Sequence, residues 1–144
     1  MADKEKIIAL GKAVIEAEAQ ALLALNNRIS NNFYEACELI LSCKGRVIVT
    51  GMGKSGHIGG KIAATFASTG TPSFFVHPGE AGHGDLGMIT SMDIIVALSN
   101  SGETGEIITL VPVIKRLGVK LIVLSGDPNS TLGKNADIFI DTRV

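Results

Sequence analysis

Residues 47–60 read VIVTGMGKSGHIGG, an apolar run that breaks into a loop of glycine, lysine and serine. A short continuous apolar run is typical of a strand buried on both faces of a parallel sheet. Comparable runs lie at 46–50, 73–76, 93–98, 119–124 and 137–140, with helical patterns at 55–69 and 104–117 and a shorter helical turn at 129–134. This alternation predicts an α/β fold, a three-layer αβα sandwich around a five-stranded parallel sheet.

Two helices are predicted ahead of the sheet. Apolar residues recur in steps of three and four over residues 4–29, at Ile7, Leu10, Val14, Ala17, Ala21, Leu25 and Ile29. A helix of that length measures about 37 Å, more than a small domain covers, so we expect part of its apolar stripe to pack on another subunit. Asn31 or Asn32 is predicted to cap a second helix, with Phe33, Ala36, Cys37, Ile40 and Leu41 facing inward.

Length and composition predict one folded domain over residues 1–144, with 46% apolar and 19% charged residues. A net charge of −1 provides no basic surface for nucleic acid. The longest apolar runs reach about seven residues, whereas a bilayer span needs about 20. The N-terminus MADKEKIIALGKAV lacks the features of a signal peptide, so a cytoplasmic protein is expected.

Cys37 and Cys43 lie about 9 Å apart along a helix, too far for an easy disulfide, and are expected to be reduced.

The chain ends at residues 141–144, directly after the last predicted strand. A parallel sheet usually covers such a strand with a following helix. We therefore expect the sequence to be the front part of a longer protein; cover by a neighbouring molecule is the alternative.

Two nucleotide-binding motifs fit the first loop in part. Gly53-Lys54-Ser55 imitates the end of a P-loop, but the glycine that this motif requires is replaced by Ile48. The glycines at 51, 53 and 56 fit a dinucleotide fingerprint, but the next strand ends in Val76-His77-Pro78, with no acidic residue before Glu80 to bind a ribose. The P-loop is excluded, a dinucleotide is disfavoured, and no cofactor is expected.

A single phosphate remains as a candidate ligand. A helix N-terminus that carries Ser55 and Lys54 offers amide donors, a hydroxyl and a cation, although the glycines could equally serve only a tight turn. A second loop, residues 99–106, follows another predicted strand and offers hydrogen-bond donors at Ser99, Asn100, Ser101 and Thr104. An N-cap explains Thr104, but not Ser99 and Ser101 together. Because ligands bind outside the carboxyl ends of parallel strands, the two loops are predicted to converge on one phosphate.

The stretches GMGKSGHIG, AATFASTGTPSFFVHPGEAGHGDLG and SNSGETGEI resemble the sugar isomerase (SIS) domain of bacterial arabinose 5-phosphate isomerases. The resemblance covers nearly the whole chain and implies interconversion of ribulose 5-phosphate and arabinose 5-phosphate for the octulosonate sugar of lipopolysaccharide or capsule. We also expect the protein to assemble as a dimer or tetramer. The resemblance further implies phosphate binding by Ser55, Ser99, Asn100, Ser101 and Thr104, and a catalytic group of Lys54, His83 and Glu106. The family's later Ser-His-Pro-Gly-Gly stretch and its CBS modules are absent from this sequence.

Aldose–ketose isomerisation moves a proton between C1 and C2 through a cis-enediol, and requires a base, an acid and stabilisation of an oxyanion. Glu106 or a histidine could be the base, and Lys54 suits the oxyanion. Structural alternatives remain: Lys54 could pair with Glu103 or Glu106, and His83 could be held by Asp85.

His77 is expected to hydrogen-bond backbone in a turn, and His57 to cap or pack within its helix. No zinc-binding spacing occurs, so no metal site is predicted, although His83 could contact an inhibitory metal ion. The alternative function is a sugar-phosphate sensor without catalysis. A heptose or hexose phosphate isomerase is disfavoured by the HPGEAGHGDLG stretch.

Overall fold

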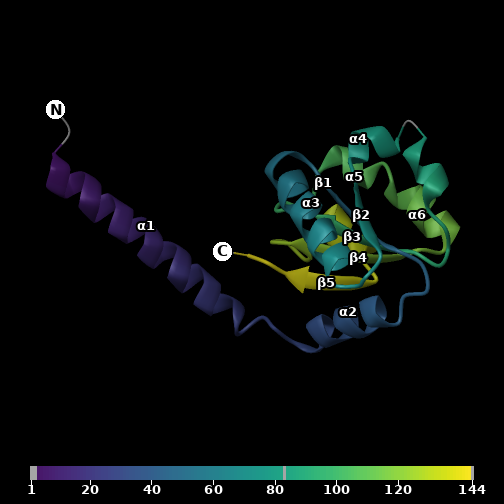
Figure 1. The fold of residues 1–144 in the computed structure, drawn as a ribbon, viewed down its shortest axis with the longest axis horizontal. Helices are drawn as coiled ribbons and strands as arrows, with labels where there is room; N and C mark the ends of the chain where they lie inside the picture. The colour runs from purple at the N-terminus through teal and green to yellow at the C-terminus, as the bar shows by residue number, and fades with distance from the viewer. Residues whose placement is uncertain (1–2, 83, 144) are drawn as a thin grey trace.

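The computed structural model describes residues 3–82 and 84–143 and contains one sheet of five parallel strands (Figure 1). The strands are β1 (Val47–Gly51), β2 (Ser73–Val76), β3 (Ile94–Leu98), β4 (Lys120–Ser125) and β5 (Ile138–Asp141). Their order across the sheet is β2-β1-β3-β4-β5, and each neighbouring pair is parallel. The predicted five-stranded parallel sheet is confirmed, with every strand within one residue of its predicted bounds.

Helices cover both faces of this sheet. One face carries α2 (Asn31–Leu41) and α3 (Gly53–Ser68). The other carries α4 (Pro78–Ala81), the 3-10 helix η1 (Asp85–Met88), α5 (Gly105–Ile108), α6 (Val111–Leu117) and α7 (Thr131–Asn135). Alternate strand residues enter two separate cores, Val47 and Val49 on the α2–α3 side and Ile48 on the other. The predicted three-layer αβα sandwich is therefore confirmed.

The helix predicted over 104–117 is two helices, α5 and α6. Pro112 has no N–H to donate to the carbonyl of Ile108, and its ring disfavours continuous helix there. The chain instead makes a tighter turn, in which Leu110 N donates to Ile107 O at 3.0 Å.

The predicted asparagine cap of α2 is wrong. Ser30 occupies the N-cap position, without a side-chain bond to the helix. Asn32 Nδ2 donates instead to Phe139 O at 3.0 Å, and Asn31 Nδ2 donates to Glu35 Oε1. Asn32 therefore ties α2 to β5, a contact between segments that are 107 residues apart in the sequence.

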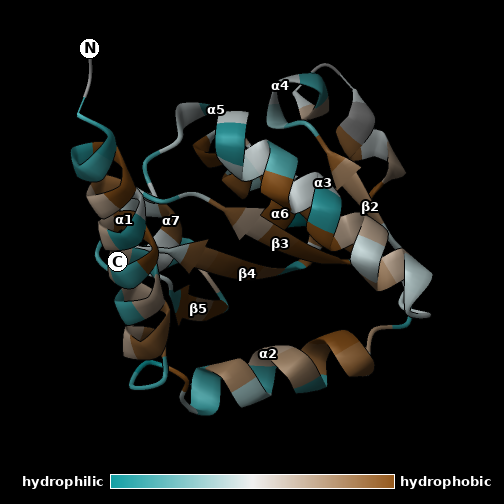
Figure 2. Cartoon of the chain, turned by 60° about the vertical axis from the view of Figure 1, so that its left-hand side comes forward, coloured by the Kyte–Doolittle hydropathy of each residue, from teal (hydrophilic) through white to brown (hydrophobic). Residues whose placement is uncertain are grey.

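The first helix, α1 (Lys4–Leu25), is shorter than the predicted 4–29 and extends away from the sandwich (Figure 1). Asp3 caps it by accepting a hydrogen bond from Glu5 N at 3.0 Å. None of its residues is buried, and Ile7, Leu10, Val14, Ile15 and Leu22 are exposed. Hydrophobic and hydrophilic residues alternate along its ribbon (Figure 2). The single chain thus leaves the predicted apolar stripe of α1 without a covering surface.

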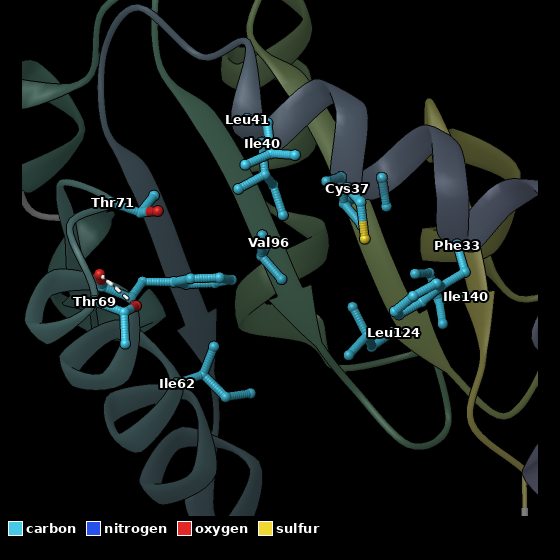
Figure 3. Close-up of a pocket in the computed structure, with 13 residues that line it drawn as sticks. Phe33, Cys37, Ile40, Leu41, Ile62, Thr69, Thr71, Val96, Leu124 and Ile140 are labelled. Carbon is cyan, nitrogen blue, oxygen red and sulfur yellow. Dashed lines mark hydrogen bonds between the residues drawn. The ribbon is translucent and has the colours of Figure 1, made fainter.

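An apolar groove of about 450 Å³ lies between α2 and α3 over the sheet (Figure 3). All five α2 residues that were predicted to face inward line it: Phe33, Ala36, Cys37, Ile40 and Leu41. Of these only Ala36 is buried, whereas Phe33 and Leu41 are exposed. These five α2 residues therefore face the sheet as predicted, but Ala36 is the one among them that is buried. Cys37 and Cys43 are both free thiols.

Candidate functional site

The carboxyl ends of β1 and β3 adjoin at the centre of the sheet, where Gly51 pairs with Leu98. From β1 the chain continues to β2 on one side, and from β3 it continues to β4 on the other. Such a change of direction separates the loops that follow the two strands and leaves a ligand-sized crevice in parallel sheets. The prediction that the loops after β1 and β3 follow neighbouring strand ends is confirmed.

The first loop is the start of α3. Met52 is the N-cap, so Lys54 and Ser55 are the second and third residues of the helix. Gly56 N donates to Met52 O at 3.1 Å in the first bond of the helical ladder. The N–H groups of residues 53–55 precede that bond and have no acceptor within the helix. A 16-residue helix therefore presents its positive end here, beside the exposed Lys54 side chain and the half-buried Ser55.

The glycines of this loop are needed for packing. A Cβ added at Gly51 would lie 2.9 Å from Ser55 O, and one added at Gly56 would lie 2.7 Å from Gly51 O. Gly53 has a positive φ of 54°. Glycine at positions 51 and 56 therefore allows the start of α3 to pack closely on the end of β1. This packing explains these two glycines without any ligand.

The second loop, residues 99–104, is closed by its own hydroxyl groups. Ser99 is buried, and its Oγ accepts a hydrogen bond from Gly102 N at 3.0 Å. The same Oγ lies 2.7 Å from Thr104 Oγ1, so one of these two hydroxyls donates to the other. Ser99 and Thr104 thus hold the loop in shape from within.

Asn100 and Ser101 lie on the exposed side of this loop. Ser101 Oγ accepts a hydrogen bond from Glu103 N at 3.2 Å, which leaves the hydroxyl proton available to an anion. The backbone carbonyl of Asn100 accepts from Gly126 N at 2.9 Å. The loop therefore separates its candidate donors into an outer pair, Asn100 and Ser101, and an inner pair, Ser99 and Thr104.

Contacts with the segment after β4 fix the position of the second loop, and sequence reasoning missed them. Gly102 has a φ of 67°, and a Cβ added there would lie 2.0 Å from Ser130 Oγ. Glu103 Oε1 accepts a hydrogen bond from Thr131 N at 2.6 Å, at the start of α7. The Ser-x-x-Gly spacing of Ser130 and Gly133 was a readable N-cap signal, since Ser130 Oγ accepts from Gly133 N at 3.1 Å.

The candidate catalytic residues come from different elements. Lys54 is exposed on α3, and Glu106 is exposed in the first turn of α5, which packs against α4. His83 lies outside the described residues. Among the residues that the structure does describe, Lys54 forms no ion pair with Glu103 or Glu106, so these groups are not neutralised by one another.

The other two histidines lie between β2 and α4 and on α3. His77 is the N-cap of α4, and its Nδ1 accepts a hydrogen bond from Gly79 N at 3.2 Å. This confirms the predicted turn contact, while α4 itself and η1 were not predicted; Pro78 at the first helical position was the available signal. His57 is exposed on α3.

Within residues 3–82 and 84–143, no three His, Cys, Asp or Glu side chains come together as a metal site requires. Over the same ranges, no helix has both the length and the apolar character needed to cross a bilayer.

Residues 40–144 match the family model of the SIS domain. The chain is 62% identical over 134 residues to arabinose 5-phosphate isomerase KdsD of Yersinia pestis, a match that covers 93% of this chain and 41% of that protein. KdsD of Pseudomonas aeruginosa is 61% identical over 130 residues, 90% of this chain and 40% of the relative. The solved structure of c3406 from Escherichia coli CFT073 in complex with arabinose 5-phosphate superposes with a TM-score of 0.93 at 41% identity, over 99% of this chain and 76% of that one. The chain thus spans about two fifths of the length of the curated relatives it matches.

Proposed function

Because this chain belongs to the SIS domain family, we propose that it is an aldose–ketose isomerase domain that interconverts ribulose 5-phosphate and arabinose 5-phosphate. The observation that carries the proposal is that β1 and β3 end side by side, β1 followed by the amino end of α3 and β3 by a loop with exposed hydrogen-bond donors. The KdsD relatives named above support this substrate class over a sugar phosphate of another size. The arabinose 5-phosphate complex of c3406 supports a pentose phosphate ligand in the same way.

The phosphate group of the substrate is bound between the two loops in this proposal. The N–H groups of residues 53–55 and the Ser55 hydroxyl donate from the α3 side, and Asn100 and Ser101 donate from the other. Thr104 and Ser99 complete the phosphate-binding set, with Ser99 acting mainly through the loop shape that its bond to Gly102 maintains. Binding the phosphate far from the reacting carbons orients C1 and C2, so that remote binding energy lowers the barrier.

The reaction itself is a proton transfer through a cis-enediol. A base removes a proton from C1 of ribulose 5-phosphate while the C2 carbonyl oxygen is protonated, which gives the enediol. The proton is then delivered to C2, and the O1 hydroxyl loses its proton as the C1 aldehyde forms. We assign Glu106 as the base, Lys54 to the developing oxyanion and His83 to proton transfer at the oxygens.

The setting of this domain is also part of the proposal. We infer that residues 1–144 form a single SIS domain, that the product feeds octulosonate for lipopolysaccharide or capsule, and that the protein is cytoplasmic and self-associates as a dimer or tetramer. The exposed apolar side chains of α1 support self-association.

Turnover distinguishes the isomerase from a sensor. The chain is mixed with ribulose 5-phosphate, and the aldehyde-derived anomeric protons of the aldose are followed by NMR. Lys54→Ala and Glu106→Ala should each lower the rate by roughly 100-fold or more, the usual contribution of a positioned acid–base group. Lys61→Ala, an exposed lysine further along α3, is the matched control and should keep the rate. Binding of arabinose 5-phosphate without turnover would support the sugar-phosphate sensor and refute catalysis by this chain.

A further inference from the structure

Glu103 carries the wrong charge for the place that it occupies. It is an exposed acidic residue in the second loop, residues 99–104, and lies between the candidate phosphate donors Ser101 and Thr104. An ionised carboxylate repels a phosphate group and has no proton to donate to it. The other polar side chains of this loop belong to serine, asparagine and threonine, which can all donate a hydrogen bond. The presence of Glu103 therefore needs a reason other than direct contact with an anion.

The Glu103 side chain is bound to a distant helix instead. Its Oε1 accepts a hydrogen bond from Thr131 N at 2.6 Å, between residues that are 28 apart in the sequence. Thr131 is the first residue of α7, and the next residue, Leu132, donates its N–H to Gly102 O at 3.0 Å. An N–H in the first turn of a helix has no acceptor within that helix, and a carboxylate binds it more strongly than a neutral oxygen does. Glu103 thus adds a charge-assisted bond to the backbone bond that joins the second loop to α7.

The backbone of Glu103 acts on Ser101. Glu103 N donates to Ser101 Oγ at 3.2 Å, so the Ser101 hydroxyl is an acceptor on this side and its proton is directed elsewhere. Serine makes such local bonds in many turns, and a bond that is exposed to water contributes little by itself. Asn100, Ser101 and Glu103 are exposed, whereas Ser99 and Gly102 are buried. The bound side chain of Glu103 therefore restrains the exposed part of the loop, where Ser101 lies.

We propose that Glu103 is a positioning residue for phosphate binding, an inference that rests on the proposed function of the second loop. By binding Thr131 N, the Glu103 side chain holds residue 103 in the conformation whose N–H orients the Ser101 hydroxyl toward the ligand. The loop is then ordered before the phosphate arrives, so binding does not have to supply the free energy of ordering it. The carboxylate itself does not touch the ligand. A purely structural role, in which Glu103 only caps α7, predicts a loss of stability without a loss of affinity.

Titration calorimetry of the 144-residue chain with arabinose 5-phosphate, and separately with inorganic phosphate, tests this role. Glu103→Ala should weaken the binding of both ligands by about fivefold or more, because the loop must then be ordered on binding. Glu103→Gln should bind within about twofold of wild type, because its amide oxygen can still accept from Thr131 N. Asn135→Ala is the matched control, since it removes a bond within α7, from Asn135 Nδ2 to Thr131 O at 2.8 Å, and leaves the second loop unchanged. This control should lower the urea midpoint and keep the affinity.

A double variant tests whether Glu103 acts through Ser101. If it does, Ser101→Ala combined with Glu103→Ala should bind within about twofold of Ser101→Ala alone. Circular dichroism in urea should show every variant folded under the conditions of the titration, since the bonds of Ser99 and the bond from Leu132 N to Gly102 O remain.

Four results would overturn the inference. They are wild-type affinity in Glu103→Ala, an equal loss of affinity in Asn135→Ala, a failure of Glu103→Gln to keep the affinity, and losses at Ser101 and Glu103 that add. A wild-type chain that binds neither ligand would refute the proposed function together with this inference, whereas unchanged binding by Glu103→Ala refutes the inference alone.

Discussion

Replacing Ser99 with alanine removes the hydroxyl on which the second loop closes. Ser99 Oγ accepts from Gly102 N at 3.0 Å and lies 2.7 Å from Thr104 Oγ1. The side chain is buried, so water cannot readily replace it. Gly102 N keeps a bond of 3.1 Å to the carbonyl of Ser99, but the hydroxyl of Thr104 loses its partner.

The magnitude follows from these two contacts. Ser99→Ala removes both hydrogen bonds of the Ser99 hydroxyl, each worth about 0.5–1.5 kcal/mol, so it should lower the free energy of unfolding by about 1–3 kcal/mol. For a domain of this size each kcal/mol corresponds to a fall in Tm of roughly 2–4 °C. Thr104→Val should cost less, about 0.5–1.5 kcal/mol, because it removes one hydrogen bond and the Ser99 hydroxyl still accepts from Gly102 N. The double variant should lose less than the two singles together, by about 0.5–1.5 kcal/mol, because it removes both partners of one bond.

Urea unfolding followed by circular dichroism measures all four corners of this cycle. Ser101→Ala is the matched control, since its exposed hydroxyl should change the free energy of unfolding by less than about 0.5 kcal/mol. The same control should reduce the stabilisation that added arabinose 5-phosphate gives to the folded state. Strictly additive losses, or a loss at Ser101 as large as at Ser99, would refute the division into an inner and an outer pair.

Two further predictions concern the frame of the site. Gly102→Ala should destabilise the fold by more than about 2 kcal/mol, because a φ of 67° is strained for alanine and its Cβ would lie 2.0 Å from Ser130 Oγ; an unchanged urea midpoint would contradict this. Asp93→Asn should lose about 1–3 kcal/mol at pH 7, because the buried carboxylate accepts from Arg46 N and Thr90 N, each at 2.7 Å. Burial raises the pKa of Asp93, but the hydrogen bonds from Thr90 and Arg46 outweigh it and hold the pKa below its ordinary value. The wild-type advantage should therefore be complete above about pH 5 and shrink as the pH falls below about 4, and a gap that stayed constant down to about pH 2 would count against it.

Local pattern was sufficient to predict the sheet. Strands buried on both faces of a parallel sheet leave continuous apolar runs, and the five runs gave the strands within one residue. The break between α5 and α6 was also readable, because Pro112 lies inside the helix predicted over residues 104–117. The role of Asn32 was not readable, because its side-chain amide donates to Phe139 O, from the far end of the chain.

For the candidate site, too, some features could be predicted from the sequence and others could not. The polar residues that follow the first and third strands indicated where an anion could bind, because strand ends of a parallel sheet share one edge. The sequence could not indicate which hydroxyls face outward. That depends on the left-handed turn at Gly102 and on its fit against Ser130, a residue from the next loop.

By itself, then, the sequence determined the αβα layers, the five strands and the two polar loops that follow β1 and β3, since each depends on neighbours a few residues apart. Only the tertiary structure decided that Ser99 and Thr104 lie within the second loop while Ser101 faces out, that Glu103 caps α7, and that α1 stands clear of the sandwich. These features arise from contacts between segments distant in sequence, or from the lack of such contacts. Residue periodicity carries no information about them, because it records only which face of an element is buried and not what lies against it.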